Sequence, residues 1–561
     1  MKINFLKEIK EDEKITIDEI VQFILEKRKI KNIDQFFNPT PPLKMSLFDF
    51  DKNYYKDFQK VIVILKEIKE KNQMIIVYTD YDADGITGGA IAWETLHLLG
   101  FRVMPYVPHR INEGYGFSIN GINNVIKQFN PSLIISVDHG ITKIKEVEYA
   151  KKKGIKIIIT DHHLKGEKIP KADAIFHIPA LSGAGVSYFF SKEVFNFFSR
   201  IARQSIASLQ NNFVNDYLTL ASIGTVADLV PLIGPSRSIV KYGLENFLKT
   251  KRIGIKHILK EAGIEGKKIT PYEIGFIIAP RINAAGRLET ALDALRLLCT
   301  KKEERAYYLA HHLGKINRQR QDVLEKSVAE AKKNLHSLKK IIILKSNHWH
   351  EGIIGLIASK IADEFYRPTI VLTKTDSHYK GSARSIPQFH ITNFLRSLKE
   401  YLIDVGGHNQ AAGFTIDEKK INDFEKQAFK KADELLTEKN LEKKIIADLK
   451  IPISKINLNL IKKIELLAPF GIGNPQPIFY SEGIITNAKI FGKKNEHLKI
   501  FVSAKEKFSF DSQQLELIYF NHSSFFSSFS RGLKIKIAYT LEINRWGGNE
   551  KIRGKIIGLN F

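Results

Sequence analysis

Patterns typical of buried strands alternate with helical patterns from about residue 55 onward. Apolar runs predict strands over 74–78, 133–137 and 155–159, and residues 86–99 predict a helix that ends at Gly100. Strands that alternate with helices indicate a parallel, doubly wound sheet. Sheets of this kind place their binding and catalytic sites just beyond the carboxyl ends of the strands, so we expect the functional site there.

The rest of the chain predicts further segments. Residues 1–50 have a helical pattern, 210–300 are mostly helical, and 311–340, charged and free of Pro, predict one long helix joining two lobes. A second strand–helix–strand pattern follows, and short β-rich segments run to the end, as in a small barrel. We therefore expect an N-terminal helical segment (1–50), an α/β domain (51–300), a connecting helix (301–340), a smaller α/β domain (341–440) and a β-rich domain (441–561).

Length and composition narrow the class of protein. The 561 residues fit three or four domains, and 43% hydrophobic with 26% charged residues is typical of a globular chain. The single cysteine, Cys299, excludes a disulfide framework and any multi-cysteine zinc or iron–sulfur site. No apolar run approaches the ~20 residues of a membrane span, and charge soon interrupts the N-terminus. We expect a cytoplasmic protein with no membrane partner.

The charge balance favours a polyanionic partner. A net charge of +25 and a pI of about 9.6 indicate nucleic acid, although a general bias toward Lys would give the same numbers. Residues 441–561 carry only a modest excess of Lys and Arg. Their aromatic residues could stack on bases, but more of them are expected in the core. These aromatic residues are Phe479, Tyr480, Phe491, Phe501 and Trp546.

Acidic and histidine residues cluster where three of the predicted strands end. They are Asp80, Asp82 and Asp84 after the first strand, Asp138 after the next, and Asp161, His162 and His163 after the third, with Asp228 in a later helical segment. A single Asp at a strand end is usually a helix cap or a turn residue. Several carboxylates at one sheet edge would repel one another unless cations neutralise them. Oxygen and imidazole ligands suit Mn²⁺, Mg²⁺ or Fe²⁺ better than a structural Zn²⁺, and a pair of metal ions would account for the ligand count.

The same segments resemble a known superfamily. Asp80–Gly85 (DYDADG), Val137–Gly140 (VDHG), Asp161–His163 (DHH) and Val226–Asp228 (VAD) are similar, in order, to the four motifs of the DHH phosphoesterases. Within that superfamily, other segments resemble the RecJ family of single-stranded-DNA exonucleases, over about residues 50–561. These are 108–116 (PHRINEGYG), 280–287 (PRINAAGR), 349–355 (WHEGIIG), 381–385 (GSARS), 406–413 (GGHNQAAG) and 469–475 (PFGIGNP). Small departures from the family pattern are Thr79 and Ala383, each in place of Gly.

The resemblance implies an architecture and a metal-ligand set. The architecture is a doubly wound α/β DHH domain, a long connecting helix, a smaller α/β domain of the DHH-associated (DHHA1) type and a β-rich, OB-like C-terminal barrel. Asp82 and Asp84 would each face one of two Mn²⁺ or Mg²⁺ ions and Asp138 would bridge them. His162 and Asp228 would complete the second metal site. Asp80 would be an additional ligand of the first metal ion or would contact one of the ligands of that ion.

Further roles also follow from the resemblance. His163 would contact the scissile phosphate, and Asp161 would orient an imidazole. The nucleophile would be a water activated by the metal ions, so no Ser or Cys nucleophile is needed. Substrate-binding candidates are Arg110, Arg281, Asn283, Arg287, Ser382, Arg384, Gly406, Gly407 and His408. As alternatives, Arg281 and Arg287 pair with carboxylates inside the fold, and the two glycines form a turn.

The candidate ligands predict a metal-dependent hydrolase of phosphodiester bonds, and the resemblance to the RecJ family implies a 5′→3′ exonuclease. By that resemblance it would cut single-stranded DNA, with a 5′-phosphorylated end, to 5′-mononucleotides in DNA repair and recombination, with a helicase and a single-strand-binding protein as partners. The chain has no phosphate-binding loop of the GxxxxGK[ST] type, so it is not expected to unwind DNA itself. The alternatives are a phosphodiesterase for short oligonucleotides or small phosphate substrates, and a non-catalytic nucleic-acid-binding scaffold.

Overall fold

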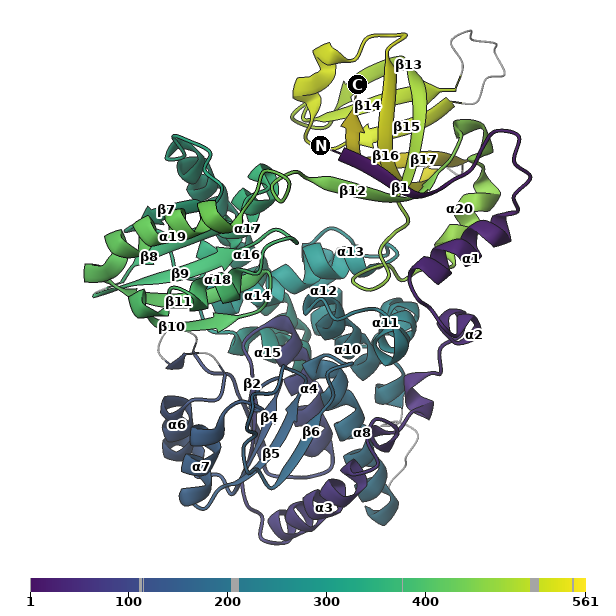
Figure 1. The fold of residues 1–561 in the computed structure, drawn as a ribbon. Coiled ribbons are helices and arrows are strands. Elements are labelled where there is room, and N and C mark those ends of the chain that lie inside the picture. Colours follow the sequence, from purple (N-terminus) through teal and green to yellow (C-terminus); the bar gives the residue numbers. More distant parts are fainter. Residues whose placement is uncertain are drawn as a thin grey trace. The chain divides into compact units, whose positions relative to one another are not determined.

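The chain forms two compact units, each of which is described here by itself. The first unit comprises residues 32–321 and 469–475, and the second comprises 1–31, 322–468 and 476–561. The structure is a computed structural model, drawn in Figure 1. It describes residues 2–109, 113–114, 116–202, 211–375, 377–504, 514–546 and 549–560, without the side chains of 200–202 and 546.

The first unit is built on a parallel sheet. Within the described residues its five strands lie in the order β3-β2-β4-β5-β6, and every neighbouring pair is parallel. The strands are β2 (Ile75–Thr79), β3 (Val103–Tyr106), β4 (Leu133–Val137), β5 (Lys156–Asp161) and β6 (Ala174–His177). Strand order reverses between β2 and β4, and ligands of doubly wound sheets bind at such a point, beyond the carboxyl ends of the strands.

Helices cover both faces of this sheet (Figure 1). Ile75 and Val77 of β2 point into a core shared with α3, α4 and α8, whereas Ile76 and Tyr78 point into a core shared with α6 and α7. Alternate side chains of a strand face opposite sides, so burial on both faces explains why the strands are continuous apolar runs. The predicted doubly wound α/β architecture is confirmed.

The helices of the first unit surround the sheet and continue beyond it. They are α2 (Ile33–Phe37), α3 (Tyr54–Glu70), α4 (Ala83–Leu98), α6 (Ile119–Phe129), α7 (Ile144–Lys152), α8 (Gly183–Ala202), α10 (Asp216–Ala227), α11 (Gly234–Asn246), α12 (Ile253–Glu261), α13 (Pro271–Glu273), α14 (Ala279–Leu288) and α15 (Leu292–Cys299). The predicted connecting helix is α16 (Glu303–Lys333). It begins before and ends before the predicted span of 311–340.

The second unit contains a smaller α/β layer. Its strands lie in the order β10-β11-β9-β8-β7, with only β7 and β8 parallel. The strands are β7 (Ile342–Ser346), β8 (Thr369–Lys374), β9 (His378–Arg384), β10 (Leu402–Gly407) and β11 (Ala411–Asp417), and the helices are α17 (Ile354–Phe365), α18 (Ile391–Arg396) and α19 (Ile421–Leu435). Apolar side chains of α17 bury one face of this sheet, and those of α18 and α19 bury the other.

The C-terminal β-domain has OB-like strand pairing. Its strands are β12 (Lys444–Lys450), β13 (Phe479–Phe491), β14 (His497–Ser503), β15 (Gln514–Tyr519), β16 (Lys534–Trp546) and β17 (Asn549–Asn560), with α20 (Leu458–Glu465) beside them. Pairing runs β13-β14-β15-β17-β16, and β16 pairs with β13 again, so it returns to its start after five strands. Phe479 and Tyr480 are buried there, as expected for core aromatics.

The N-terminal segment departs from the helical prediction. Lys2–Glu8 forms strand β1, which pairs in parallel with β12, and only then does α1 (Ile17–Lys27) follow. The residues of β1 are mostly exposed, and the alternation of Lys2, Ile3, Asn4 and Phe5 is too short to distinguish a strand from a helix. Its hydrogen-bond partner lies more than 400 residues away along the chain. Long-range pairing of this kind decides the structure without leaving a local signal.

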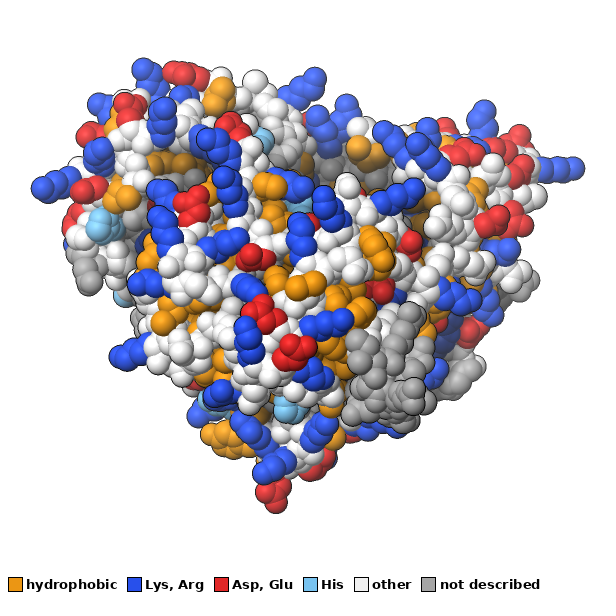
Figure 2. All heavy atoms as spheres, turned by 90° about the horizontal axis from the view of Figure 1, so that it is seen from below, with side chains coloured by type: hydrophobic (Ala, Val, Ile, Leu, Met, Phe, Trp, Pro, Cys, Tyr) orange, Lys and Arg blue, Asp and Glu red, His pale blue; other side chains and the backbone are white. Residues whose placement is uncertain are grey.

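The surface is broadly basic. On the face shown in Figure 2, Lys and Arg side chains are spread over the surface with acidic side chains between them, rather than gathered in one patch. This distribution agrees with general attraction to a polyanion and equally with a bias toward Lys. Among the described helices, none combines the length and the apolar composition needed to cross a bilayer.

Candidate metal centre

Three strand ends bring the acidic motifs together. β2, β4 and β5 are parallel neighbours, with Thr79 opposite Val137 and Val137 opposite Thr160. The residues that follow, Asp80, Asp138 and Asp161, therefore reach the same edge of the sheet. They are at most 2% exposed. Buried carboxylates need hydrogen bonds or cations to compensate for lost hydration.

The first motif turns directly from β2 into α4. Asp82 is the N-cap of α4, and its Oδ1 accepts hydrogen bonds from the amides of Asp84 and Gly85, both at 3.0 Å. A side chain at Gly85 would place its Cβ 2.7 Å from the carbonyl oxygen of Asp80. The tight turn thus requires glycine at this position, and it leaves the other oxygen of Asp82 available to a ligand.

Asp84 is fixed by the start of α8. Its Oδ2 accepts a hydrogen bond from the amide of Gly183 at 2.6 Å, and its Oδ1 accepts one from Ala184 at 2.9 Å. The amides at a helix N-terminus have no partner within the helix and favour negative charge. These two hydrogen bonds compensate the Asp84 carboxylate for the hydration that it loses on burial, since its side chain is only 1% exposed.

His162 faces three carboxylates. Its Nε2 lies 3.1 Å from Asp138 Oδ1, 3.4 Å from Asp228 Oδ2 and 3.8 Å from Asp84 Oδ2. Asp138 has a left-handed backbone, with φ of 68°, and Asp228 is the C-cap of α10. Neither His162 Nε2 nor Asp138 Oδ1 makes a hydrogen bond within the described residues, although both atoms are buried. Such atoms are what a metal ion would bind.

The electrostatics of the cluster favour a bound cation. Burial, followed by the negative charges of Asp84 and Asp82, raises the pKa of Asp138 well above its usual value and raises the pKa of Asp228 to about 8. Burial also lowers the pKa of His162. Without a metal ion, the site therefore disfavours the ionised carboxylates that metal binding requires. A bound divalent cation would neutralise their charge and remove this conflict.

The residues fit two metal ions. Within the described residues, groups whose candidate ligand atoms lie within 4.8 Å of one another are Asp80, Asp82 and Asp138; Asp84, His162 and Asp228; and Asp138, His162 and His163. Asp138 and His162 each belong to two of these groups, and Asp138, as a carboxylate with two oxygens, could bridge the ions. Carboxylate oxygens with one or two imidazoles suit Mn²⁺ or Mg²⁺, and no cysteine takes part.

Both oxygens of Asp161 accept hydrogen bonds, one of them from the ring of His163. Its Oδ1 accepts hydrogen bonds from the amides of His162 and His163 and from His163 Nδ1 at 2.8 Å, and its Oδ2 accepts one from Ile141 at 2.9 Å. Burial opposes both charges of this pair. The hydrogen bond between them nevertheless raises the pKa of His163 to about 9 and lowers that of Asp161 below its usual value. His163 is therefore charged at neutral pH in the metal-free protein.

This pair predicts a pH dependence of stability. Because the pKa of folded His163 is raised from 6.5 to about 9, its contribution is complete below pH 6.5 and is lost as the pH rises through 9. We expect His163→Gln to lower the free energy of unfolding of the metal-free protein at about pH 6, with the difference from wild type shrinking toward about pH 10. Urea unfolding of both proteins across this range is the measurement, and a difference independent of pH would contradict the assignment.

The arginine and asparagine candidates of the first unit fall into different settings. Arg281 Nε donates to Glu261 Oε2 at 2.7 Å, so the structure favours the alternative in which Arg281 pairs inside the fold. Asn283 Oδ1 accepts a hydrogen bond from the amide of Ala83 at 2.7 Å, within the first motif. Arg287 lies half-buried on the same helix, α14. Arg110 lies outside the described residues.

The candidates of the second unit lie on one sheet, in which β11 separates β9, with Ser382 and Arg384, from β10, with Gly406 and Gly407. Arg384 Nη1 donates to Ser382 Oγ at 3.2 Å, and a Cβ at Gly355 of α17 would meet both side chains at 3.0 Å. Gly406 and Gly407 end β10 and, with His408, are exposed at the β10–β11 hairpin. Gly407 has φ of 146° and its Cβ would stand 2.3 Å from the carbonyl oxygen of Ala411. A turn therefore explains Gly407, and a role in substrate binding stays a prediction.

Sequence reasoning missed the residues that support the ligands. Gly183 and Ala184 hold Asp84 through their amides, and a Cβ at Gly183 would lie 2.4 Å from Asp138 Oδ1. A Cβ at Gly224 of α10 would lie 2.3 Å from Asp84 Oδ1. The run of small residues from Ser182 to Gly185 (SGAG) was the available signal. Such runs also occur in ordinary turns, so the pattern alone does not identify a support for ligands.

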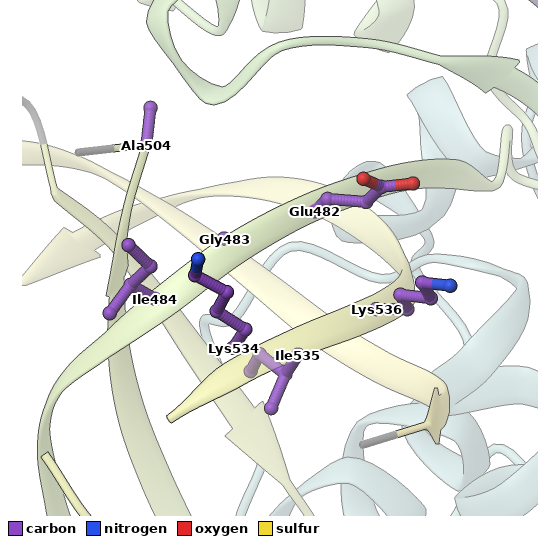
Figure 3. Close-up of a pocket in the computed structure, with 7 residues that line it drawn as sticks. All are labelled: Glu482, Gly483, Ile484, Ala504, Lys534, Ile535 and Lys536. Atoms are coloured by element: carbon purple, nitrogen blue, oxygen red, sulfur yellow. The ribbon is translucent and has the colours of Figure 1, made fainter. Parts of the chain in front are cut away.

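The C-terminal β-domain offers a separate pocket. A hollow of about 320 Å³ is lined by Glu482, Gly483, Ile484, Ala504, Lys534, Ile535 and Lys536 (Figure 3). None of the aromatic residues considered for base stacking lines it. Phe491 and Phe501 are half-buried elsewhere in this domain, and the side chain of Trp546 lies outside the described residues. Among the described residues, the pocket lining therefore contains no aromatic side chain.

Comparison with known proteins decides the family. The sequence matches the family profiles of the DHH family N-terminal domain (74–225), the DHHA1 domain (338–437) and the RecJ OB domain (447–557). The single-stranded-DNA-specific exonuclease RecJ of Haemophilus influenzae is 31% identical over 89% of this chain and 90% of its own length. The chain belongs to the RecJ family. RecJ of Bacillus subtilis is 32% identical over 92% of this chain, which spans 65% of that protein.

Solved RecJ structures share the fold. Thermus thermophilus RecJ in complex with Mn²⁺ superposes with a TM-score of 0.80 at 24% identity, over 100% of this chain and 80% of that one. A manganese-bound exonuclease RecJ superposes with a TM-score of 0.57 at 32% identity, over 66% of this chain and 93% of that one. The DHH, DHHA1 and OB-like parts predicted from the motifs are confirmed.

Proposed function

We propose that this RecJ-family chain is a metal-dependent exonuclease that hydrolyses single-stranded DNA in the 5′→3′ direction and releases 5′-mononucleotides. The observation that carries the proposal is the convergence of Asp138, His162 and Asp228 on one buried point, with Asp84 held beside them. No ligand position of the family pattern is lost. A scaffold would have no reason to keep mutually repelling, buried carboxylates.

The side chains divide into holding and orienting roles. Asp82, Asp80 and Asp138 would hold one Mn²⁺ or Mg²⁺ ion, and Asp84, His162, Asp228 and Asp138 would hold the other. The bound ions would activate a water molecule and neutralise the charge that develops on the phosphate oxygens. The amides of Gly183 and Ala184 fix the angle at which Asp84 enters the site. This preorganisation lowers the cost of assembling the site during each turnover.

His163 would act on the substrate. Its Nδ1 donates to Asp161 Oδ1 at 2.8 Å, which fixes the plane of the ring. In the charged ring the Nε2 proton then remains to be donated to a phosphate oxygen. The positive charge that Asp161 stabilises on His163 would complement the growing negative charge on the phosphate. Asp161 thus acts through His163 and contacts no substrate itself.

The substrate and its suppliers complete the proposal. In the second unit, Ser382, Arg384 and the hairpin at Gly406, Gly407 and His408 would bind the phosphate backbone, preferably at a 5′-phosphorylated end. A helicase and a single-strand-binding protein would supply single strands during DNA repair and recombination. The reaction would take place in the cytoplasm, the location expected from the sequence.

The substrate class is the first point to test. We expect the enzyme, with Mn²⁺ or Mg²⁺, to convert a single-stranded DNA of several tens of nucleotides to mononucleotides faster than it hydrolyses dinucleotides, cyclic dinucleotides or pyrophosphate. The positively charged surface and the additional OB-like domain would bind a long polyanion but add nothing for a small substrate. Initial rates are compared at equal concentrations of scissile bonds, and the products are separated by anion-exchange chromatography.

Two outcomes would replace the proposal. Faster hydrolysis of the small substrates would keep the metal centre and make the chain a small-substrate phosphodiesterase. Binding of the single strand without hydrolysis of any of these compounds, in either metal, would favour a nucleic-acid-binding scaffold.

Raising the salt concentration should weaken binding of the long strand much more than binding of a dinucleotide, because fewer phosphate contacts are lost with the dinucleotide.

A further inference from the structure

The loop that carries three of the candidate ligands is held from outside by another helix. This loop, Asp80–Asp84, runs from the end of β2 into the first turn of α4, whose first residue is Ala83. The amide of Ala83 therefore has no partner within its own helix. It donates instead to Oδ1 of Asn283, on α14, at 2.7 Å, across 200 residues of sequence.

A second contact comes from the same face of α14. A Cβ at Gly286 would stand 2.7 Å from the carbonyl oxygen of Tyr81, so α14 packs directly on the backbone of the loop there. Asn283 and Gly286 are three residues apart and thus lie on one side of the helix. Tyr81 and Ala83 flank Asp82. The helix consequently touches the loop on both sides of a candidate ligand.

α14 is itself anchored to its neighbours. Arg281 Nε donates to Oε2 of Glu261, on α12, at 2.7 Å, and Glu261 Oε1 also pairs with Arg318 of α16. A Cβ at Gly314 of α16 would lie 2.0 Å from Glu261 Oε1, so only glycine admits the carboxylate at this position. Arg281 and Asn283 are therefore part of one rigid support, with Arg281 fixing the helix and Asn283 fixing the loop.

We propose that Asn283 is a positioning residue, which sets Asp82 and Asp84 for metal binding through the backbone of Ala83. A backbone N–H can only donate, so the atom of Asn283 that faces it must be the carbonyl oxygen, and the amide orientation is fixed. Loss of this acceptor leaves the amide of Ala83 unsatisfied beside a buried carboxylate. This inference rests on the proposed metal centre, because it assigns the residues that hold the ligands in place.

Three variants test the inference. Asn283→Ala removes the acceptor, and Asn283→Asp keeps an oxygen at the same position. As a control, Asn246→Ala removes a comparable half-buried asparagine at the end of α11, whose Nδ2 donates to the carbonyl oxygen of Val214. Two readouts are used: hydrogen exchange of the amide of Ala83 in the metal-free protein, and Mn²⁺ affinity from the electron paramagnetic resonance signal of free Mn²⁺. Neither depends on DNA cleavage.

The expected pattern is specific to the acceptor. In Asn283→Ala the amide of Ala83 exchanges at least about tenfold faster and Mn²⁺ affinity falls about 10- to 100-fold, the range typical of residues that orient ligands. Asn283→Asp restores both toward wild type, and Asn246→Ala changes neither. Unchanged exchange and affinity in Asn283→Ala, with slower DNA cleavage, would overturn the inference and make Asn283 a substrate contact.

Failure of the proposed function would look different. If the wild-type chain binds no Mn²⁺, the metal centre is wrong, and faster exchange at Ala83 in Asn283→Ala would still show that α14 holds the loop. If the wild type binds Mn²⁺ and Asn283→Ala exchanges and binds as the wild type does, the metal centre stands and the positioning role is wrong.

Discussion

Replacement of Asp138 by asparagine is expected to abolish DNA hydrolysis and, at the same time, to stabilise the metal-free protein. Asp138, like His162, belongs to two of the three candidate metal-binding groups, and as a carboxylate it could bridge both ions. The substitution removes a negatively charged ligand that both ions would share. We expect the rate to fall about 10³-fold, equivalent to about 4 kcal/mol of transition-state stabilisation. Binding of single-stranded DNA should change little, because the substrate is bound largely through other residues.

The gain in stability is expected because the ionised Asp138 carboxylate is unfavourable in the folded, metal-free protein. Burial and the neighbouring carboxylates raise the pKa of folded Asp138 above its usual value of 3.8, so ionisation penalises the folded state increasingly as the pH rises above that value. Asparagine has the same shape without the charge. A relief of about 1 kcal/mol would raise the melting temperature of the metal-free protein by about 2–4 °C at neutral pH.

Thermal unfolding in chelator and steady-state rates on single-stranded DNA are the two measurements for this variant. Asp216→Asn is the matched control, since Asp216 lies at the opposite end of α10 from Asp228 and its Oδ1 accepts from Thr250 at 2.7 Å. We expect this control to keep its activity. An Asp138→Asn enzyme that cleaves DNA at the wild-type rate would remove Asp138 from the metal centre.

Substitution of Gly183 by alanine is the second change with a large expected effect. Its Cβ would stand 2.4 Å from Asp138 Oδ1, and its amide is the one that donates to Asp84 Oδ2 at 2.6 Å. Both candidate ligands must therefore move to admit one methyl group. We expect Mn²⁺ affinity and the rate of DNA hydrolysis each to fall about 100-fold, the upper range for residues that orient ligands.

Gly185→Ala provides the control on the same helical turn. Its Cβ would meet Leu181 at 3.2 Å and Ile239 at 3.3 Å, apolar neighbours that can shift slightly without touching a ligand. This variant should lose some stability but keep its Mn²⁺ affinity. Circular dichroism and Mn²⁺ titration of both variants separate misfolding from a damaged site. Equal Mn²⁺ affinity in Gly183→Ala and wild type would refute the supporting role of α8.

The core of the site could be predicted from sequence because its signals are local. Asp80, Asp138 and Asp161 each follow a continuous apolar run, and parallel strands place their carboxyl ends at one edge. The pattern therefore shows which residues converge. It does not show which oxygen is engaged by the backbone, so the pattern alone could not separate Asp161 from the carboxylates left for metal ions. The orienting role predicted for Asp161 came from the resemblance to the DHH phosphoesterases.

Long-range partners account for what the sequence could not show. β1 is a strand because β12 lies beside it, and Arg281 is held by Glu261, which lies 20 residues earlier at the end of α12. Arginine beside a motif predicts phosphate binding and internal ion pairing equally well. Likewise, Gly183 has no periodic pattern that marks it as the neighbour of Asp138. These contacts are set by packing, which one sequence does not reveal.

The central claim is tested most directly by degradation of a 3′-labelled, 5′-phosphorylated single strand in Mn²⁺ or Mg²⁺, beside its blunt duplex. We predict that the labelled strand shortens stepwise from its 5′ end, that the duplex persists, and that EDTA or Asp138→Asn stops the reaction. Shortening from the 3′ end, equal loss of the duplex, or cleavage that continues in EDTA would contradict the account.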